Sequence, residues 1–220
     1  MDKSKTRRPP SNAAALSPDV PPSREGGKEP ASKRIALAAI LGPGVSRFSA
    51  SEQEWIAEAY DLAERSHKDV LRLSGNPYIQ HPVSVARTLM DLGLDCASVC
   101  AGLLHDTIED TETSREELVD VFGDDVASLV AEVTDDPGLL RDERRRRQVE
   151  TAPAKSARAR MIKLADKIAN LHSIAESPPV GWSGRRKREY VAWAREVAAA
   201  CGPTNERLER LFEKAAQALD

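Results

Sequence analysis

The sequence of 220 residues lacks long apolar runs and is poor in cysteine. No stretch approaches the ~20 apolar residues that span a bilayer, and the N-terminus has no apolar centre of a secretory signal. Three cysteines, Cys96, Cys100 and Cys201, cannot form a disulfide framework, which suits a reducing compartment. We therefore expect a cytoplasmic protein without a membrane partner. Cys96 and Cys100 are interpreted as small core residues rather than a metal pair.

An excess of charge of one sign is also missing. The 32 Lys and Arg nearly balance the 35 Asp and Glu, leaving a formal net charge of −3. This balance gives no overall case for binding nucleic acid or a membrane surface. Aromatic residues make up 4% of the chain, and the tryptophans show no spacing that suggests a base-stacking platform. The expected partner is a small molecule, and the sequence does not indicate an oligomeric state.

What the sequence does contain is helical periodicity. Apolar residues recur at helical spacing between Gly and Pro breaks, and no alternating strand pattern or internal repeat is evident. This predicts an all-α bundle of about nine helices. One expected helix continues from Val99 to Asp110, another ends at Phe122-Gly123, and a third covers Ala157–Glu176. Helix caps are expected at Ser49 or Ser51 and at Thr113 or Ser114.

The first 48 residues differ in composition from the rest. Proline recurs among Ser, Gly, Lys and Arg, so this segment has little apolar surface to bury. We predict a disordered or partly helical tail over residues 1–48 and one folded domain over residues 49–220. The apolar stretch Ile35–Leu41 is compatible with one short helix that docks on the domain or on a partner.

The stretch Leu103–Asp110 places one imidazole and three carboxylates directly after an apolar run. On a continuous helix, His105 and Glu109 would share a face, as would Asp106 and Asp110. Desolvating so many ionisable groups is costly unless they are paired or hold a metal. The alternative is a solvated acidic helix end, which the helix dipole disfavours.

His81 and Asp166 are two further polar residues in apolar surroundings. His81 precedes Pro82 at an expected helix start, so taken alone it would be a surface or capping residue. Asp166 lies beside an apolar stripe, and an ion pair with Lys163 or Lys167 explains it as well as a functional role does.

Taken together, the polar residues form a mixed nitrogen and oxygen ligand set. Two imidazoles and two carboxylates suit Mn²⁺, Fe²⁺ or Zn²⁺ better than Ca²⁺, and the absence of thiolate argues against a structural zinc site. Glu109 and Asp110 would then be available to handle the protons of a water molecule. The candidate ligands are His81, His105, Asp106 and Asp166.

This pattern resembles the H…HD…D signature of the HD phosphohydrolase superfamily. The surrounding sequences are narrower: RLSGNPYIQHP (residues 72–82), LLHDTIEDT (103–111) and KLADKIANL (163–171) are similar to the hydrolase domain of the RelA/SpoT alarmone enzymes. The likeness runs from about residue 48 to the C-terminus. Because no second domain follows, the chain resembles the small, hydrolase-only branch, the metazoan-SpoT-homologue type.

The resemblance implies a pyrophosphohydrolase with one Mn²⁺ per site that converts ppGpp and pppGpp to GDP or GTP and pyrophosphate. It implies that the four candidate ligands hold the metal and that Glu109 and Asp110 are the catalytic acids. On the substrate side it implies that the flat guanidinium of Arg72 packs on the guanine ring. Further implied contacts come from Ser74, Asn170 and Tyr190.

Two departures from the family pattern keep other functions open. Leu73 stands where many relatives have Lys, and His172 where many have Arg, which thins the positive charge around a nucleotide. One alternative is an HD-type phosphatase for another nucleotide, such as a dNMP or NADPH. The other is a non-catalytic alarmone-binding regulator, against which the intact Glu109 and Asp110 argue.

The charged stretch Arg141–Gln148 contains four consecutive arginines, which wrap around a helix and cannot all face one ligand. A solvated helix is one interpretation. The other is that Arg144 and Arg147 reach the pyrophosphate through bidentate contacts. Nucleic-acid binding is the weakest interpretation because the rest of the domain is acidic.

Overall fold

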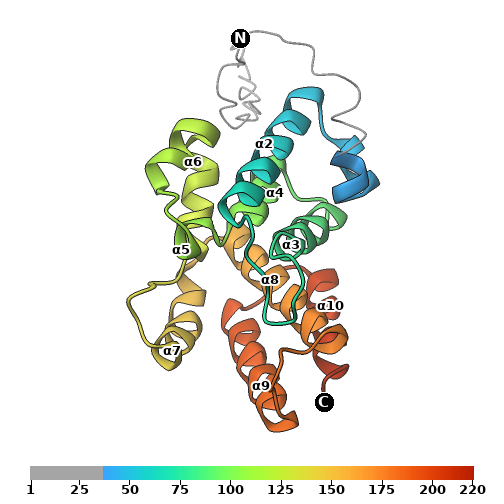
Figure 1. Ribbon diagram of the computed structural model, residues 1–220, viewed down its shortest axis with the longest axis vertical. Helices are drawn as coiled ribbons and strands as arrows, with labels where there is room; N and C mark the ends of the chain where they lie inside the picture. Colours follow the sequence, from blue (N-terminus) through green and yellow to red (C-terminus); the bar gives the residue numbers. More distant parts are fainter. Residues whose placement is uncertain (1–36) are drawn as a thin grey trace, which may run out of the picture.

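A computed structural model describes residues 37–220 and confirms an all-α architecture over this range (Figure 1). Within the described part, the backbone forms nine α-helices, and its only β-pairing is an isolated bridge between Leu71 and Pro77. None of these helices combines the length and apolar character needed to cross a bilayer. The elements are η1 (Pro43–Arg47), α2 (Ala50–Ser66), α3 (Gln80–Asp91), α4 (Cys96–Leu104), α5 (Thr107–Asp110), α6 (Arg115–Val133), α7 (Arg141–Thr151), η2 (Ala152–Ala154), α8 (Ala157–Glu176), α9 (Gly184–Cys201) and α10 (Glu206–Gln217).

Helix α8 runs through the middle of the molecule and has the bounds that the sequence predicts. It contacts α3, α4, α6, α9 and α10, so almost every turn of the helix is covered by a neighbour (Figure 1). Its continuous buried stretch from Ile162 to Ala169 includes three ionisable residues. Because burying charge is costly without partners, these three residues mark the region of the site. They are Lys163, Asp166 and Lys167.

Side-chain caps begin two of the earlier helices. Ser49 caps α2 and Ser114 caps α6, each in a capping box with the glutamate three residues later. Both serines are among the capping residues that the sequence predicts. Cys96 and Cys100 are also buried in the core as predicted.

Gly123 divides α6 into two parts. Its φ of 78° and ψ of 170° lie outside the helical region, in backbone space that only glycine adopts readily. The predicted break at Phe122-Gly123 is therefore confirmed, although the helix bounds continue across it.

The predicted continuous helix from Val99 to Asp110 is wrong. Helix α4 ends at Leu104, and α5 begins at Thr107. Side chains replace the expected backbone donors at the break: the Thr107 hydroxyl donates to Leu104 O at 2.7 Å, and His105 Nδ1 lies 2.9 Å from Gly102 O. Because local side chains satisfy these carbonyls, the backbone can leave the helical path at His105 and Asp106.

The packed part of the chain includes residues that the sequence assigns to the tail. Residues 37–41 are helical, and Leu37, Leu41, Val45 and Phe48 are buried in the main core. The expected boundary after residue 48 therefore falls inside a packed region. Within the apolar stretch Ile35–Leu41, residues 37–41 form a helix that docks on the domain, and the rest of the predicted tail, residues 1–36, lies outside the described residues.

Candidate active site

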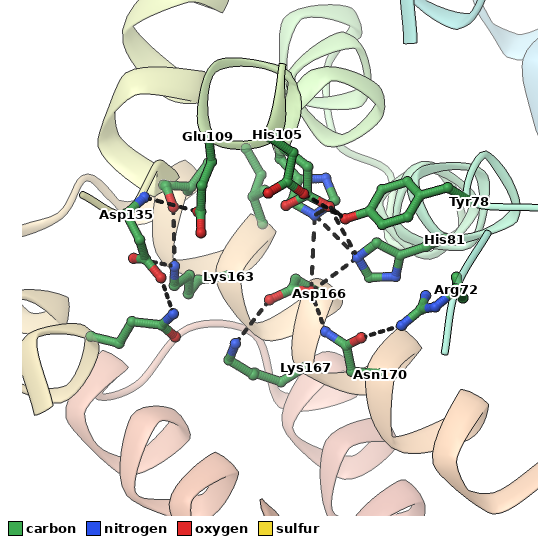
Figure 2. A pocket seen from close by; sticks show the side chains of 15 residues that line it. Arg72, Tyr78, His81, His105, Glu109, Asp135, Lys163, Asp166, Lys167 and Asn170 are labelled. Carbon is green, nitrogen blue, oxygen red and sulfur yellow. Dashed lines mark hydrogen bonds and ion pairs between the residues drawn. The ribbon is translucent and has the colours of Figure 1, made fainter. Parts of the chain in front are cut away.

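A polar cavity of about 190 Å³ lies where α3, the α4–α5 break, α8 and the α6–α7 region meet. All six residues predicted as metal ligands or catalytic acids line it, as do Arg72 and Asn170. Figure 2 shows Tyr78 and His81 toward one end of the cavity, Glu109 and Asp135 toward the other, and Asp166 between them. Helix packing therefore gathers residues that are widely separated in the sequence.

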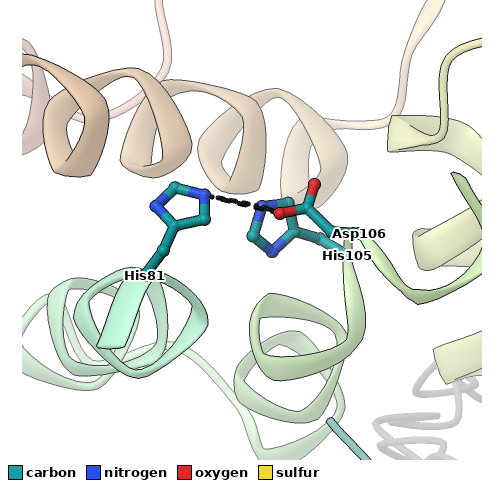
Figure 3. A group of neighbouring side chains, drawn as sticks. All are labelled: His81, His105 and Asp106. Atoms are coloured by element: carbon teal, nitrogen blue, oxygen red, sulfur yellow. Dashed lines mark hydrogen bonds and ion pairs between the residues drawn. The ribbon is translucent and has the colours of Figure 1, made fainter. Parts of the chain in front are cut away.

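Two imidazoles face each other in this cavity, with a carboxylate on either side (Figures 2 and 3). His81 Nε2 and His105 Nε2 are 3.2 Å apart. Asp106 Oδ2 lies 3.5 and 3.1 Å from these two nitrogens, and Asp166 Oδ1 lies 3.2 and 3.9 Å from them. Even without Asp166, the residues His81, His105 and Asp106 each offer a ligand atom, and these three atoms all lie within 4.8 Å of one another. Two nitrogens and two oxygens this close can hold a divalent transition metal.

The protonation of the histidine rings supports this assignment. Because Gly102 O can only accept, His105 Nδ1 donates to it, and a neutral ring then presents the Nε2 lone pair to the cavity. His81 Nε2 faces the same point, and its buried Nδ1 has no hydrogen-bond partner within residues 37–220. The His105 lone pair, together with His81 Nε2 and the nearby carboxylate oxygens of Asp106 and Asp166, faces a point that suits a cation or a proton, so the donor set fits a metal ion.

The charges around the two rings favour a proton on His105 whenever no cation lies between them. Burial lowers the pKa of His105, but the charges of Asp106 and Asp166 outweigh it and raise the pKa to about 9. Burial dominates at His81 and lowers its pKa. Burial opposes ionisation of Asp106 as well, yet His105 and His81 hold the pKa of that carboxyl well below its usual range. The site is therefore preorganised as an anionic pocket for positive charge.

Asp166 belongs to α8 and is held on both oxygens. Lys167 Nζ lies 3.0 Å from Oδ2, and Asn170 Nδ2 donates to Oδ1 at 2.6 Å. The ion pair that the sequence offers as an alternative role for Asp166 is present, and it coexists with the contact to His81. Although burial raises the pKa of Asp166, Lys167 and His81 more than compensate and hold the carboxyl ionised.

The acidic pair after the α4–α5 break divides between the two ends of the cavity. Glu109 Oε1 accepts from Arg144 Nη1 at 2.9 Å, and Oε2 accepts from the backbone N–H of Asp135 at 3.1 Å. Asp110 instead faces Tyr78. Burial is the main reason that the pKa of each acid is raised, reinforced by Asp135 at Glu109 and by Asp106 at Asp110.

Tyr78 is a site residue that the sequence analysis missed. Its hydroxyl lies 2.6 Å from Asp106 Oδ2 and 3.0 Å from Asp110 Oδ2, so it links a candidate ligand to a candidate catalytic acid. Its ring stacks on His67, with centroids 4.5 Å apart and planes 10° apart. Asp106 and Asp110 thus do share a side, as predicted, but through this hydroxyl rather than through one continuous helix.

Three other cavity residues also went unassigned from the sequence. Asp135 and Gln148 lie outside the sequence segments that carry the resemblance, and Lys163 was considered only as a partner for Asp166. The available signal was the charge of Lys163 inside the apolar α8 segment, since a buried lysine requires partners. Its partners are Val133 O at 3.0 Å and Asp135 Oδ1 at 3.1 Å.

The predicted substrate contacts are only partly brought together. Arg72 donates to Asn170 Oδ1 at 2.6 Å, so the guanidinium is anchored at the cavity wall. Ser74 contacts Asn76 and does not line the cavity. Tyr190 is buried, packs against Trp182 and Trp193, and also lies outside the cavity lining.

Arg144 and Arg147 of α7, the two arginines predicted to reach the pyrophosphate, lie beside the cavity rather than in it. Arg144 reaches Glu109, and together with Arg147 it lines a neighbouring open cavity of about 470 Å³. Asp135 borders both cavities, so it is the residue that separates them. The solvated-helix interpretation holds for Arg146, which is 63% exposed and pairs with Glu143 on its own helix.

The two departures from the family pattern lie on the Arg72 side. The Leu73 side chain points away from the protein, with 71% of the residue exposed. His172 lines another cavity of about 180 Å³ that shares Arg72 and His81 with the metal-site cavity. Neither residue touches the candidate metal ligands through a hydrogen bond or ion pair in the described structure.

Comparison with known proteins agrees with this fold. The family model for the HD domain matches residues 59–191, a range that contains every candidate metal ligand. The chain belongs to the HD-domain family.

Within this family the chain is similar to small hydrolases of animals. It is 44% identical over 172 residues to guanosine-3′,5′-bis(diphosphate) 3′-pyrophosphohydrolase MESH1 of Mus musculus, covering 74% of this chain and 96% of the mouse protein. The Homo sapiens MESH1 is 45% identical over 167 residues, covering 74% of this chain and 93% of that protein. A solved structure described as a metazoan orthologue of SpoT that hydrolyses ppGpp superposes with a TM-score of 0.71 at 36% identity, covering 77% of this chain and 96% of the other.

Proposed function

We propose that this protein is a metal-dependent hydrolase that removes the 3′-pyrophosphate of ppGpp and pppGpp, giving GDP or GTP and pyrophosphate, in the cytoplasm. The observation that carries the proposal is the convergence of two imidazoles, two carboxylates and a separate acidic pair in one cavity. The likeness to the MESH1 enzymes, which extends over almost their whole length, supports this substrate.

The proposed cofactor is one Mn²⁺ per site, held by His81, His105, Asp106 and Asp166. Imidazole nitrogen with carboxylate oxygen is a ligand set that Mn²⁺ shares with Fe²⁺ and Zn²⁺, so the choice of Mn²⁺ rests on the family resemblance. A divalent cation in this position stabilises negative charge on the phosphoryl oxygens.

The other cavity residues supply proton transfer and positioning. A water molecule attacks the phosphorus bonded to the 3′-oxygen, that bond breaks, and the 3′-oxygen gains a proton as pyrophosphate leaves. The acidic pair Glu109 and Asp110 takes one proton from the water and returns one to the 3′-oxygen, and Tyr78 orients Asp110. Arg72, fixed by Asn170, contacts the nucleoside, and the buried Lys163 and Lys167 place positive charge beside the phosphates.

A hydrolase for another nucleotide is the second candidate, favoured by one observation. Leu73 and His172 leave the Arg72 side of the site without the additional cations that many relatives have. A phosphatase acting on a dNMP or on NADPH would use the same metal and the same acids, but it would release orthophosphate.

The test is a hydrolysis assay with Mn²⁺ on wild type and Glu109→Ala in parallel, with ppGpp, a dNMP and NADPH as substrates. We expect wild type to release pyrophosphate from ppGpp and the variant to lose about 10²–10⁴-fold in rate, the usual contribution of a general base. Intact ppGpp alongside orthophosphate release from another nucleotide would assign the second function. Saturable binding of ppGpp without turnover of any substrate would point to the non-catalytic regulator.

A further inference from the structure

Asp135 contacts the proposed catalytic machinery through its backbone. Its N–H donates to Glu109 Oε2 at 3.1 Å, while Arg144 occupies the other carboxylate oxygen at 2.9 Å (Figure 2). Asp135 lies just after the end of α6, in the non-helical connection to α7, so no helical hydrogen bond fixes the direction of this N–H. Thr134, whose N–H and hydroxyl both donate to Val130 O, holds the preceding residue, and the bonds of the Asp135 side chain hold Asp135 itself.

Two buried donors hold that side chain. Lys163 Nζ of α8 lies 3.1 Å from Asp135 Oδ1, and Gln148 Nε2 of α7 donates to Oδ2. Lys163 is 5% exposed and Gln148 is 9% exposed, so water does not compete freely for these bonds. Because a carboxylate only accepts, the amide of Gln148 has one permitted orientation, with Nε2 toward Asp135.

Lys163 and Gln148 therefore fix the connection from two different helices. Lys163 also donates to Val133 O at 3.0 Å, so one ammonium group ties the end of α6 and the side chain of Asp135 to α8. A shift of α7 or α8 relative to this connection would therefore turn the Asp135 N–H that donates to Glu109.

We propose that Asp135 is a positioning residue for Glu109, and that Gln148 and Lys163 act through it to set the geometry of the attacking water. This inference rests on the proposed function, because it assigns no chemistry of its own to Asp135. Misplacing a reacting group by about 1 Å costs on the order of 10²-fold in rate, so loss of this support lowers kcat. Metal affinity and KM stay close to wild type because the ligands and Arg72 are untouched and Lys163 keeps its bond to Val133 O.

The test exchanges the donor and the acceptor. In D135N the new amide has a single acceptor oxygen for two donors, and in Q148E two carboxylates face each other. We expect each single variant to lose about 30-fold or more in kcat for ppGpp with Mn²⁺, with KM changed less than about 3-fold. In the double variant D135N/Q148E, the new amide accepts from Lys163 and donates to the new carboxylate, so kcat returns to within about 5-fold of wild type.

The control is Glu150→Gln, which removes an exposed carboxylate from the same helix and is expected to leave kcat unchanged. Thermal melting and Mn²⁺ titration of every variant separate lost folding from lost positioning. Full kcat in both single variants overturns the inference, as does a folded, metal-binding double variant that stays slow. If a single variant does not fold, the double variant alone decides between these outcomes.

The proposed function and the positioning role fail in different ways. No ppGpp hydrolysis by wild type removes the proposed function, whereas an undiminished rate in Glu109→Ala removes only the catalytic role of Glu109 on which the positioning role rests. An active wild type, an inactive Glu109→Ala and a fully active D135N remove only the role of Asp135.

Discussion

His105 serves the site through both ring nitrogens. Nδ1 is bound to the backbone carbonyl of Gly102, and this bond also belongs to the set that ends α4. Nε2 faces His81 and Asp106. The same side chain therefore helps to end α4 and supplies a candidate ligand atom. A substitution of His105 would affect both the helix end and the candidate metal site.

The raised pKa of His105 predicts how the stability of the metal-free protein depends on pH. The pKa is about 9 in the folded state, against 6.5 for a histidine in the unfolded chain. Stabilisation by the charged ring is therefore complete below pH 6.5 and lost as pH rises through 9. We expect a loss of up to about 3 kcal/mol over this window in the presence of chelator. The lowered pKa of His81 acts below pH 6.5 and leaves this window unaffected.

Urea unfolding at several pH values with chelator measures this effect. His105→Gln serves as the control, because it removes the titrating ring and is expected to flatten the slope between pH 6.5 and 9. The same slope in both proteins would assign it to other groups.

Tyr78 shows why the sequence identifies ligands more readily than the residues that orient them. Its role depends on a contact between a loop and the α4–α5 break, and no spacing rule relates those two segments. We expect Tyr78→Phe to lower Mn²⁺ affinity or kcat about 10-fold to 100-fold, the usual effect of losing a hydrogen bond to a ligand. Metal titration and steady-state kinetics measure both, and unchanged values would make the hydroxyl dispensable.

At the scale of helices, the sequence predicts ends that are set by local chemistry. Ser49, Ser114 and Gly123 were all identified, because capping and left-handed backbone depend on nearby residues. The break between α4 and α5 was missed because the apolar and acidic pattern of Val99–Asp110 suits an uninterrupted helix. The side-chain bonds of His105 and Thr107 to the preceding carbonyls override that pattern.

Gly123 gives a prediction at this scale. A Cβ is strongly disfavoured at φ 78°, ψ 170°, so Gly123→Ala is expected to destabilise the fold by about 1–3 kcal/mol. Asp120→Ala, at an exposed helical position one turn earlier, is expected to change stability by less than about 0.5 kcal/mol. Chemical denaturation of the two variants compares them directly, and equal stabilities would show that the kink is not strained.

At the scale of the whole molecule, the sequence identifies the all-α class and the one domain that carries the site. It does less well at the N-terminal edge of that domain. Proline-rich composition suggested a tail up to residue 48, yet Leu41, Val45 and Phe48 pack into the same core as α3. Composition is an average over many residues, whereas burial of this segment depends on a few apolar side chains that pack into the core.

Leu41 provides the test of that packing. It is 2% exposed, so Leu41→Ala is expected to cost about 2–5 kcal/mol. Leu140→Ala is the matched control, because Leu140 is 83% exposed and its truncation leaves no cavity. A difference of less than about 1 kcal/mol between the two in urea would contradict the placement of this segment in the core.

The position of Asp166 on α8 has a consequence for how the protein matures. The residues that converge with it, on α3 and at the α4–α5 break, lie far earlier in the chain. During synthesis, a nascent chain that has already folded its first helices still lacks this carboxylate until α8 leaves the ribosome. If Asp166 is the fourth ligand, as proposed, the complete ligand set forms only after α8 has joined the earlier helices, and tight metal binding would then report the completed long-range topology.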